Sequence, residues 1–402
     1  MKQETTLGHE NRANGETGAG FVLRRAASLA VVCLLTFGLL AASVEFLARQ
    51  IFRRSATQVW SCFAPSAAAT GIRPIPNSVC WEKLPESPLV EYRFNACGHR
   101  TTAGCGPKPE GAVRVVLIGS SQVLGYQVPY DETFAFRLEH MLSAASGRQV
   151  EVDNQGVLFG TPRATSLRFG EALADKPDLI LWTLSPWDVQ NVIQTQDVLP
   201  LAEVDPNGGP PPPKWRRYLN ALRKDGIKKL LLGTRSVLMM QHLLYLSPSQ
   251  YMKNYLMQAD DPGIFAREAP PAWRKRWSDL DAIARDLEEQ AKAAGIPFAV
   301  TAVPDLAGAL MLSSGDWAPQ LDPQAFGDRI RSIAERHGGV YLDVLSGFRQ
   351  APDPERLYYV VDGHMNPEAH ALLSRLLADR LTSGFAVLKR QGPGGSAGPA
   401  GR

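Results

Sequence analysis

From Val113 onward the chain alternates between short, continuous apolar runs and amphipathic stretches with helical spacing. Uninterrupted apolar runs are typical of strands that are buried on both faces of a sheet. These runs predict five strands, at residues 113–119, 150–156, 179–185, 297–303 and 340–345. The amphipathic stretches predict helices at residues 131–146, 164–174, 279–294 and 323–337, and a closing helix after Pro367.

This alternation also predicts how the elements are arranged. Strands that alternate with helices form a parallel sheet with helices on both faces and right-handed crossovers. We therefore expect an α/β domain over residues 111–384, a three-layer flavodoxin-like sandwich around a five-stranded parallel sheet. In such sheets, sites form beyond the carboxyl ends of the strands.

One insertion interrupts the alternation, at residues 199–276. It contains the sequence DPNGGPPPP, which excludes a helix or central strand and predicts an exposed linker, whereas most of the remainder predicts helices. Residues 226–246 are apolar enough to suggest a membrane span, but Lys228, Lys229 and Arg235 interrupt them. Burying such charges in lipid is costly, so we expect a packed or lid-like helix.

The longest apolar stretch lies near the beginning of the chain. Residues 26–44 are uncharged and rich in Leu, Val and Ala, and about 20 such residues span a bilayer. A cleaved signal peptide is the alternative, but its apolar region is usually about 7–15 residues long. We expect a polar tail at 1–25, an uncleaved transmembrane anchor at 26–48, and a second flexible tail at 385–402.

Four cysteines follow the apolar stretch within residues 49–110, whereas Cys33 lies inside it. An even number of clustered cysteines suggests disulfides and an oxidising compartment. The simplest of the three pairings joins Cys62 to Cys80 and Cys97 to Cys105. A metal site is the alternative, but neither a CxxC pair nor a zinc-type histidine spacing is present. We expect a disulfide-stapled lead-in segment and no metal.

Composition narrows the classes of function. The 402 residues carry 43 basic and 40 acidic side chains, a net charge of +3. These charges are spread along the chain and create no basic field suited to nucleic acid, so we expect no nucleic-acid partner. Neither GxGxxG nor a Gly-Lys-Ser/Thr ending occurs, and we expect no cofactor.

Two short segments carry candidate chemistry. Ser121 follows the first predicted strand in the sequence Gly-Ser-Ser-Gln, where a helix start would offer N–H groups to an oxyanion. The simpler interpretation is that this serine caps the helix. Far along the chain, Asp362 and His364 precede a helix that Asn366 can cap. Such a pair can activate a hydroxyl, although an isolated histidine there would be an ordinary loop residue.

These segments occur with two others in an order that resembles the SGNH (GDSL-like) esterases and acyltransferases. The matching blocks are GSS at 119–121, NQG at 154–156, SPWD at 185–188 and DGHMNPEAH at 362–370, and residues 92–100 resemble the lead-in strand of membrane-anchored bacterial members. The resemblance covers residues 90–381, without the insertion. It implies Ser121 as the nucleophile, His364 as the general base and Asp362 as its orienting carboxylate. The N–H groups of Ser121 and Gly156 would be the oxyanion donors.

The sequence departs from the family pattern at three places. Ser120 stands where the family usually has Asp, and Trp187 stands where an asparagine amide normally completes the oxyanion hole. The Asp-x-His spacing is shorter than the Asp-x-x-His of many members. Trp187, Asp188 and Asn191 are candidates for a substrate pocket, whereas His99 and His370 are expected to be structural.

The resemblance therefore implies a serine esterase or acyltransferase that acts on O-acyl, foremost acetyl, esters of cell-envelope glycans. The resemblance places it in a bacterial inner membrane, held by one helix, with its catalytic domain in the periplasm. The alternative is a catalytically weak or inactive relative that binds glycan or envelope partners.

Overall fold

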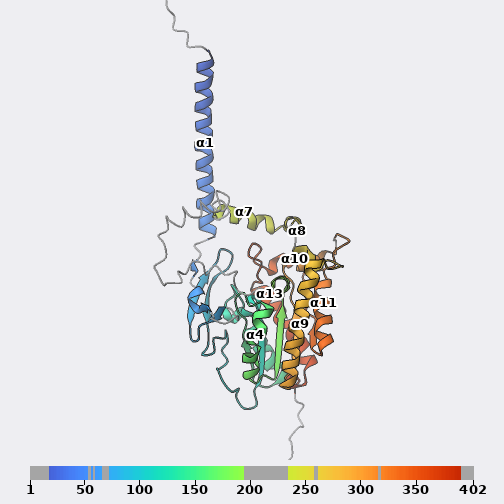
Figure 1. Ribbon diagram of the computed structural model, residues 1–402. Coiled ribbons are helices and arrows are strands. Elements are labelled where there is room, and N and C mark those ends of the chain that lie inside the picture. Colours follow the sequence, from blue (N-terminus) through green and yellow to red (C-terminus); the bar gives the residue numbers. More distant parts are fainter. Residues whose placement is uncertain are drawn as a thin grey trace, which may run out of the picture.

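The protein is described here by a computed structural model, in which residues 18–52, 56–57, 59–65, 72–193, 234–257, 261–315 and 318–390 are described. A long N-terminal helix stands away from a folded body (Figure 1). The predicted linker at 205–213 lies outside the described residues, as do the first part of the insertion and both chain ends.

The centre of the body is a five-stranded sheet. Its strands are β6 (Val113–Gly119), β7 (Val150–Asn154), β8 (Leu179–Leu184), β9 (Phe298–Ala302) and β10 (Val340–Leu342). They pair in the order β10-β9-β8-β6-β7, and all four pairings are parallel. In chain order this is 2-1-3-4-5, the flavodoxin-like arrangement. The predicted fold class is confirmed.

Helices cover both faces of the sheet. On one face pack α3 (Phe134–Ser146) and α13 (Pro367–Gly384). On the other pack α4 (Pro162–Ala174), α9 (Pro271–Ala293) and α11 (Ala325–His337). Every residue of β6 to β9 is buried, as continuous apolar runs require.

Some boundaries differ from the prediction. Helix α9 begins at Pro271, eight positions before the predicted start at 279, because Trp273 and Trp277 extend its buried face. Strand β10 ends at Leu342, and a short helix, α12 (Leu345–Arg349), begins where strand was expected. Helix α10 (Leu306–Ser314) was not predicted, because it is buried almost all round and so lacks an amphipathic pattern.

The lead-in segment forms small antiparallel sheets beside the body. Strand β4 (Val79–Lys83) lies between β1 (Ala56–Thr57) and β5 (Leu89–Arg93) and pairs antiparallel with both. After a short 3-10 helix, η1 (Val59–Cys62), β2 (Phe63–Pro65) pairs with β3 (Ile72–Pro74). The disulfides are Cys62–Cys80 and Cys97–Cys105, the pairing that the sequence favours.

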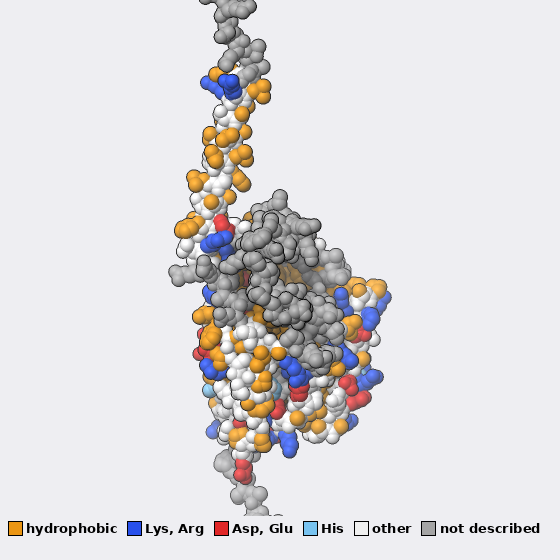
Figure 2. Space-filling view, turned by 60° about the vertical axis from the view of Figure 1, so that its left-hand side comes forward, with side chains coloured by type: hydrophobic (Ala, Val, Ile, Leu, Met, Phe, Trp, Pro, Cys, Tyr) orange, Lys and Arg blue, Asp and Glu red, His pale blue; other side chains and the backbone are white. Residues whose placement is uncertain are grey.

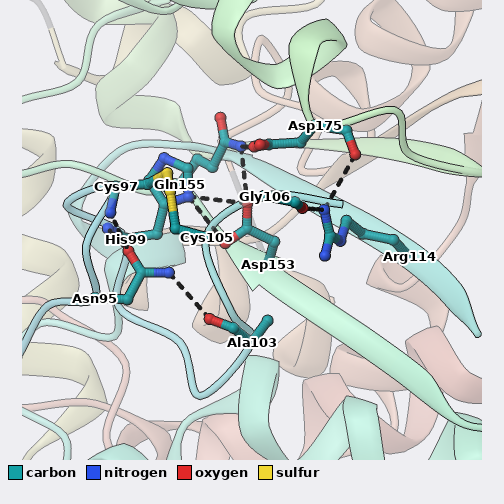
Figure 3. The surroundings of a disulfide bond; sticks show 10 residues. All are labelled: Asn95, Cys97, His99, Ala103, Cys105, Gly106, Arg114, Asp153, Gln155 and Asp175. Atoms are coloured by element: carbon teal, nitrogen blue, oxygen red, sulfur yellow. Dashed lines mark hydrogen bonds and ion pairs between the residues drawn. A yellow bond between two sulfur atoms is a disulfide. The ribbon is translucent and has the colours of Figure 1, made fainter. Parts of the chain in front are cut away.

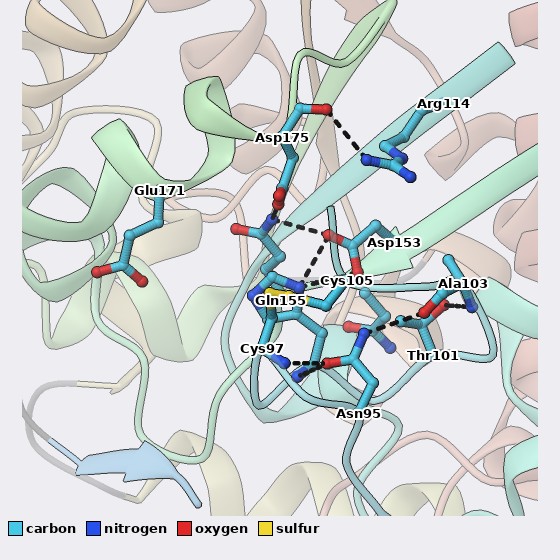
Figure 4. A network of polar contacts seen from close by, with 12 residues as sticks. Asn95, Cys97, Thr101, Ala103, Cys105, Arg114, Asp153, Gln155, Glu171 and Asp175 are labelled. Carbon is cyan, nitrogen blue, oxygen red and sulfur yellow. Dashed lines mark hydrogen bonds and ion pairs between the residues drawn. A yellow bond between two sulfur atoms is a disulfide. The ribbon is translucent and has the colours of Figure 1, made fainter. Parts of the chain in front are cut away.

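The second disulfide lies beside a buried polar network (Figures 3 and 4). His99 Nδ1 is 3.0 Å from Asp153 Oδ1, and Gln155 Nε2 donates to Asp153 at 2.9 Å and to Asp175 at 2.6 Å. His99, Asp153 and Asp175 lie close enough to hold a metal. In this structure these groups hydrogen-bond with each other and with the Gln155 amide. The network instead ties the Cys97–Cys105 loop to β7.

Helix α1 (Gly18–Ile51) contains the predicted anchor and extends beyond it at both ends. Residues Phe21–Ile51 are long and apolar enough to cross a membrane, and among the described residues no other helix meets that test. Hydrophobic side chains cover the exposed shaft of this helix (Figure 2). The described part of the insertion contains α7 (Arg235–Tyr245), whose 11 residues are too short for a span.

The C-terminal boundary differs from the prediction. Residues 385–402 were expected to form a flexible tail, but a short 3-10 helix, η6 (Ala386–Leu388), follows α13. Phe385 and Leu388 are buried in the same core as β6 and α3. The folded body therefore reaches Leu388, because these two apolar side chains are removed from water.

Candidate active site

The candidate nucleophile lies at the carboxyl end of β6, where the strand turns into α2 (Ser121–Leu124). Gly119 has φ +152°, and a side chain there would place Cβ 2.7 Å from the Thr183 carbonyl oxygen. Glycine is therefore required at this turn. The turn lies between β6 and β8, the two strands at which the strand order reverses, where ligands bind in open α/β sheets.

The structure brings together the three residues predicted as a triad. Ser121 Oγ is 2.7 Å from His364 Nε2, and His364 Nδ1 is 2.5 Å from Asp362 Oδ1. When Nδ1 carries the proton and donates a hydrogen bond to the Asp362 carboxylate, Nε2 is unprotonated and can accept the serine proton. The arrangement therefore satisfies the geometric requirements of an activated serine.

The loop that carries Asp362 and His364 is fixed at both ends. Asn366 caps α13 by accepting the N–H groups of Glu368 and Ala369 through its side-chain oxygen. At the other end, the buried Glu86 carboxylate accepts the backbone N–H groups of Val361 and Asp362, at 3.0 and 3.1 Å. The orientation of the base therefore depends on a residue from the lead-in segment.

The charges around the base favour its function. Partial desolvation raises the pKa of the Asp362 carboxyl, but the charge and hydrogen bond of His364 outweigh this effect and hold the pKa below its ordinary value. Asp362 is therefore ionised at neutral pH and can stabilise a protonated His364.

A second carboxyl group lies behind the base. The rings of Tyr126 and His364 meet edge to face with their centroids 4.9 Å apart, and the Tyr126 hydroxyl donates to Glu82 Oε1 at 3.0 Å. Glu82 is 2% exposed, and burial raises its pKa to about 7; the hydrogen bond from Tyr126 partly opposes this rise, and the nearby Asp362 charge adds to it. Tyr126 and Glu82 thus form a buried support for one side of the imidazole.

The other two histidines singled out from the sequence are structural. His370 is buried against Phe134, and its Nδ1 accepts the Phe134 N–H. Burial lowers its pKa to about 3, so it stays neutral. His99 pairs with Asp153, away from the triad.

A cavity of about 210 Å³ opens beside Ser121 and His364. The aromatic side chains of Phe159, Trp187 and Trp273 form part of its wall, and the amides of Gln122 and Gln190 also line it. It combines apolar surface with a few polar groups, as ligand sites do.

The three predicted pocket residues differ in position. Trp187 lines the cavity and is 36% exposed. Asp188 does not line it; its carboxylate is buried and accepts the Ser185 N–H at 2.7 Å and the Ser185 hydroxyl at 2.6 Å. Asn191 points its amide at the Trp187 carbonyl instead. The assignments of Asp188 and Asn191 were therefore wrong, because both side chains cap the local turn.

Asp188 nevertheless supports the nucleophile turn. Burial raises its pKa to about 6, while hydrogen bonds from Ser185 and from Ser120 act in the opposite direction. Ser120 thus contacts a carboxylate contributed by α5 (Pro186–Gln190). The carboxylate that contacts the turn at Ser120 therefore comes from Asp188 on α5 and not from the turn itself.

The predicted oxyanion donors also need correction. Ser121 is the first residue of α2, and the first N–H groups of a helix lack partners within it, so its N–H remains an expected donor. The Gly156 N–H instead donates to Asn154 Oδ1 at 3.0 Å, and Gly156 packs beneath the backbone of α2. Gly160 approaches the nucleophile turn, because a Cβ at this position would be 3.5 Å from the Ser120 Cα.

Several neighbours of the triad were missed from the sequence. Glu82, Glu86 and Tyr126 carry no motif, because they reach the site only through the fold. Phe159 has φ +54°, an unusual backbone conformation for a bulky residue, and lies between Trp60 and Trp187. Gly160 is a sequence signal that could have been used: a glycine shortly after the Asn154 block lets the backbone approach Ser120 closely.

No family model matches the sequence, and no curated protein matches it. Solved structures that match include TesA, with 14% identity over 67% of this chain and 98% of that chain, at a TM-score of 0.37. An acetyl-xylooligosaccharide esterase from Geobacillus Stearmophilus, called Axe2, matches with 14% identity over 69% of this chain and 97% of that one, at a TM-score of 0.37. A lipase/acylhydrolase from Enterococcus faecalis matches with 11% identity over 67% and 95%, at 0.36. These likenesses are distant.

Proposed function

We propose that this protein is a serine esterase or acyltransferase that acts on O-acyl, foremost acetyl, esters of cell-envelope glycans. The observation that supports this most directly is the pair of contacts from Ser121 to His364 and from His364 to Asp362. All three residues line the cavity at the carboxyl edge of the sheet.

The proposed reaction uses each member of the triad once in each half. Ser121 Oγ attacks the ester carbonyl while His364 Nε2 takes its proton, and the resulting imidazolium gives that proton to the departing alcohol. This leaves an acyl group on Ser121. Water or a sugar hydroxyl then attacks it, again with His364 as base, and Ser121 is regenerated. Asp362 stabilises the imidazolium in both halves.

The size and lining of the cavity suit a substrate with a small acyl group and a sugar ring as the alcohol part. A volume of about 210 Å³ is small for a substrate site, so a short acyl chain fits it better than a long one. Trp187 and Phe159, with ring centroids 6.2 Å apart, offer apolar surface that can pack against a sugar ring.

The envelope location has separate support. Helix α1 is long and apolar enough to anchor the body. The disulfides Cys62–Cys80 and Cys97–Cys105 indicate an oxidising compartment, which in a bacterium is the periplasm. We therefore infer that the body lies on the periplasmic side of an inner membrane.

The proposal is tested by the turnover of a chromogenic acetyl ester by full-length protein. Ser121→Ala and His364→Ala should each abolish it, whereas Ser166→Ala and His140→Ala, at exposed positions on α4 and α3, should leave it unchanged. Unaltered turnover in the triad variants would exclude this mechanism. Adding an unacetylated polysaccharide separates the two reactions, because a transferase moves acetyl groups onto the polymer whereas an esterase releases acetate.

A non-catalytic glycan-binding protein is the second candidate. It is favoured by Trp187 at the family's asparagine position and by the engaged Gly156 N–H, which together leave fewer oxyanion donors. Losing one such donor typically costs about a hundred- to a thousandfold in rate. In that case glycan would bind, but Ser121 would not react with a serine-directed phosphonate.

A further inference from the structure

Helix α7 is attached to the helix that can span a membrane. The Glu45 carboxylate of α1 accepts the N–H groups of Arg235 and Ser236 at 3.2 and 2.8 Å, and so caps the beginning of α7. Phe52, just beyond α1, contacts the ring of His242 with centroids 5.4 Å apart. In Figure 1, α7 runs across the axis of α1 at the end where α1 meets the body.

The depth of this junction follows from the sequence of α1. Residues 26–44 are uncharged, and at about 1.5 Å per residue these 19 residues are about 28 Å long. The hydrocarbon core of a bilayer is about 30 Å thick. Glu45 therefore marks the point where a membrane-spanning α1 leaves the hydrocarbon, and α7 begins at that level.

The outer face of α7 is apolar, whereas on α8 (Pro248–Leu256) the exposed residues include Gln250 and Lys253, and the exposed apolar residues Leu256 and Met257 come only at its end. Every residue of α7 is described, and none is buried. His242 faces the body, where its Nδ1 is 2.7 Å from Glu86 Oε1, and Tyr245 packs against the core. At about 3.6 residues per turn, Met240, Leu243 and Leu244 point the opposite way. The exposed apolar residues of α7 and of the segment that follows it are Met240, Leu243, Leu244, Leu246, Leu256 and Met257.

This face needs a covering. Leu243 is 61% exposed and Met257 is 71% exposed. Helix α7 is held to the rest of the protein on one side only, and none of its 11 residues is fully buried, whereas isolated helices of this length are marginal in water. The sequence from Thr234 to Met257 contains no acidic residue but includes Arg235 and Lys253, which suits an anionic lipid surface.

We propose that the outer face of α7 lies in the boundary between headgroups and acyl chains of the membrane that α1 spans, with the end of α8 at the same surface. Amphipathic helices of this kind bury their apolar face about 5–10 Å into that boundary. The occupant follows from continuity with α1, whose exit point is hydrogen-bonded to α7. Helix α8 also contributes Tyr255 to the wall of the catalytic cavity, so the site would lie beside the membrane surface. This inference is independent of the proposed chemistry.

The test uses full-length protein in vesicles of phosphatidylethanolamine and phosphatidylglycerol. In a Cys33→Ser background, which removes the free cysteine, Leu243→Cys carries an environment-sensitive fluorophore. Leu167→Cys, on α4 and 39% exposed, is the matched control. Met240→Cys replaces Leu243→Cys if the latter does not fold, as judged by its thermal unfolding midpoint.

Lipids that carry a nitroxide high on the acyl chain should quench the fluorophore at position 243, and lipids with the nitroxide near the chain end should quench it less. The control at 167 should not be quenched by either. Absence of quenching at 243 would overturn the proposal in two distinguishable ways. A water-like emission would mean that the face is bare, and a shielded emission would mean that another segment, a second copy or a partner protein covers it.

Discussion

Ser121 and His364 are separated by 243 positions in the sequence, yet their Oγ and Nε2 atoms are 2.7 Å apart. This contact joins the first turn of the sheet to the loop before the last long helix. It makes the rest of the site testable, because residues that only hold one of the two partners should affect turnover in predictable ways.

Glu86 should act as a positioning residue for the Asp362 loop. Glu86→Ala leaves the part-buried N–H of Val361 and the exposed N–H of Asp362 without their acceptor, and a hydrogen bond to a charged group contributes about 1.5–3 kcal/mol. We expect kcat to fall by about tenfold or more while KM changes little, and Glu86→Gln to retain more activity. Glu289→Ala, at an exposed position on α9, is the control. A lower unfolding midpoint with unchanged kcat would show that Glu86 stabilises the fold only.

Glu82 should make stability depend on pH. Its pKa is raised from 4.5 to about 7 by burial, so the folded protein holds this proton more tightly than the unfolded chain does. The contribution of this protonated carboxyl to the free energy of unfolding is complete below pH 4.5 and is lost as the pH rises through 7. Glu82→Gln should therefore be more stable than wild type above pH 8, by about 3 kcal/mol, and equally stable at low pH.

The measurement for Glu82 is the thermal unfolding midpoint across this pH range. Glu91→Gln, on the exposed side of β5, should follow wild type. A Glu82→Gln variant whose midpoint parallels wild type at every pH would show that Glu82 is not the titrating group.

Trp187 should contribute to substrate binding. It lines the cavity beside Phe159, and Trp187→Ala removes apolar surface that the substrate would cover. A loss of about 1 kcal/mol corresponds to an increase in KM of about fivefold, with kcat little changed. Trp187→Phe should lose less. If Trp187→Ala raises kcat/KM instead, the indole obstructs the cavity and does not bind substrate.

The parts of the site that were predictable from the sequence lie in short contiguous segments. Ser121 follows a buried strand, and Asp362 and His364 precede a capped helix; a parallel sheet brings such segments to one edge. The sheet itself was predictable because continuous apolar runs leave few alternatives. Helix α10 was not, since burial on nearly all sides removes the periodic pattern on which prediction depends.

The supporting residues could not be predicted, because their roles depend on tertiary contacts. Glu86 is 275 positions from the Val361 N–H that it accepts, and nothing local marks it. Asp188 was misassigned because a polar residue after a strand suggests a site, whereas its carboxylate is used by Ser185. Gly156 was misassigned for a similar reason: its N–H is satisfied by Asn154, two residues away.

The central claim is that His364 activates Ser121 for nucleophilic attack. It is tested most directly by treating full-length protein with a serine-directed fluorophosphonate and locating the adduct by peptide mass spectrometry. We predict one adduct on Ser121 in wild type and much slower labelling in His364→Ala and Asp362→Asn. An unlabelled Ser121, or equal labelling rates with and without the imidazole, would contradict the account.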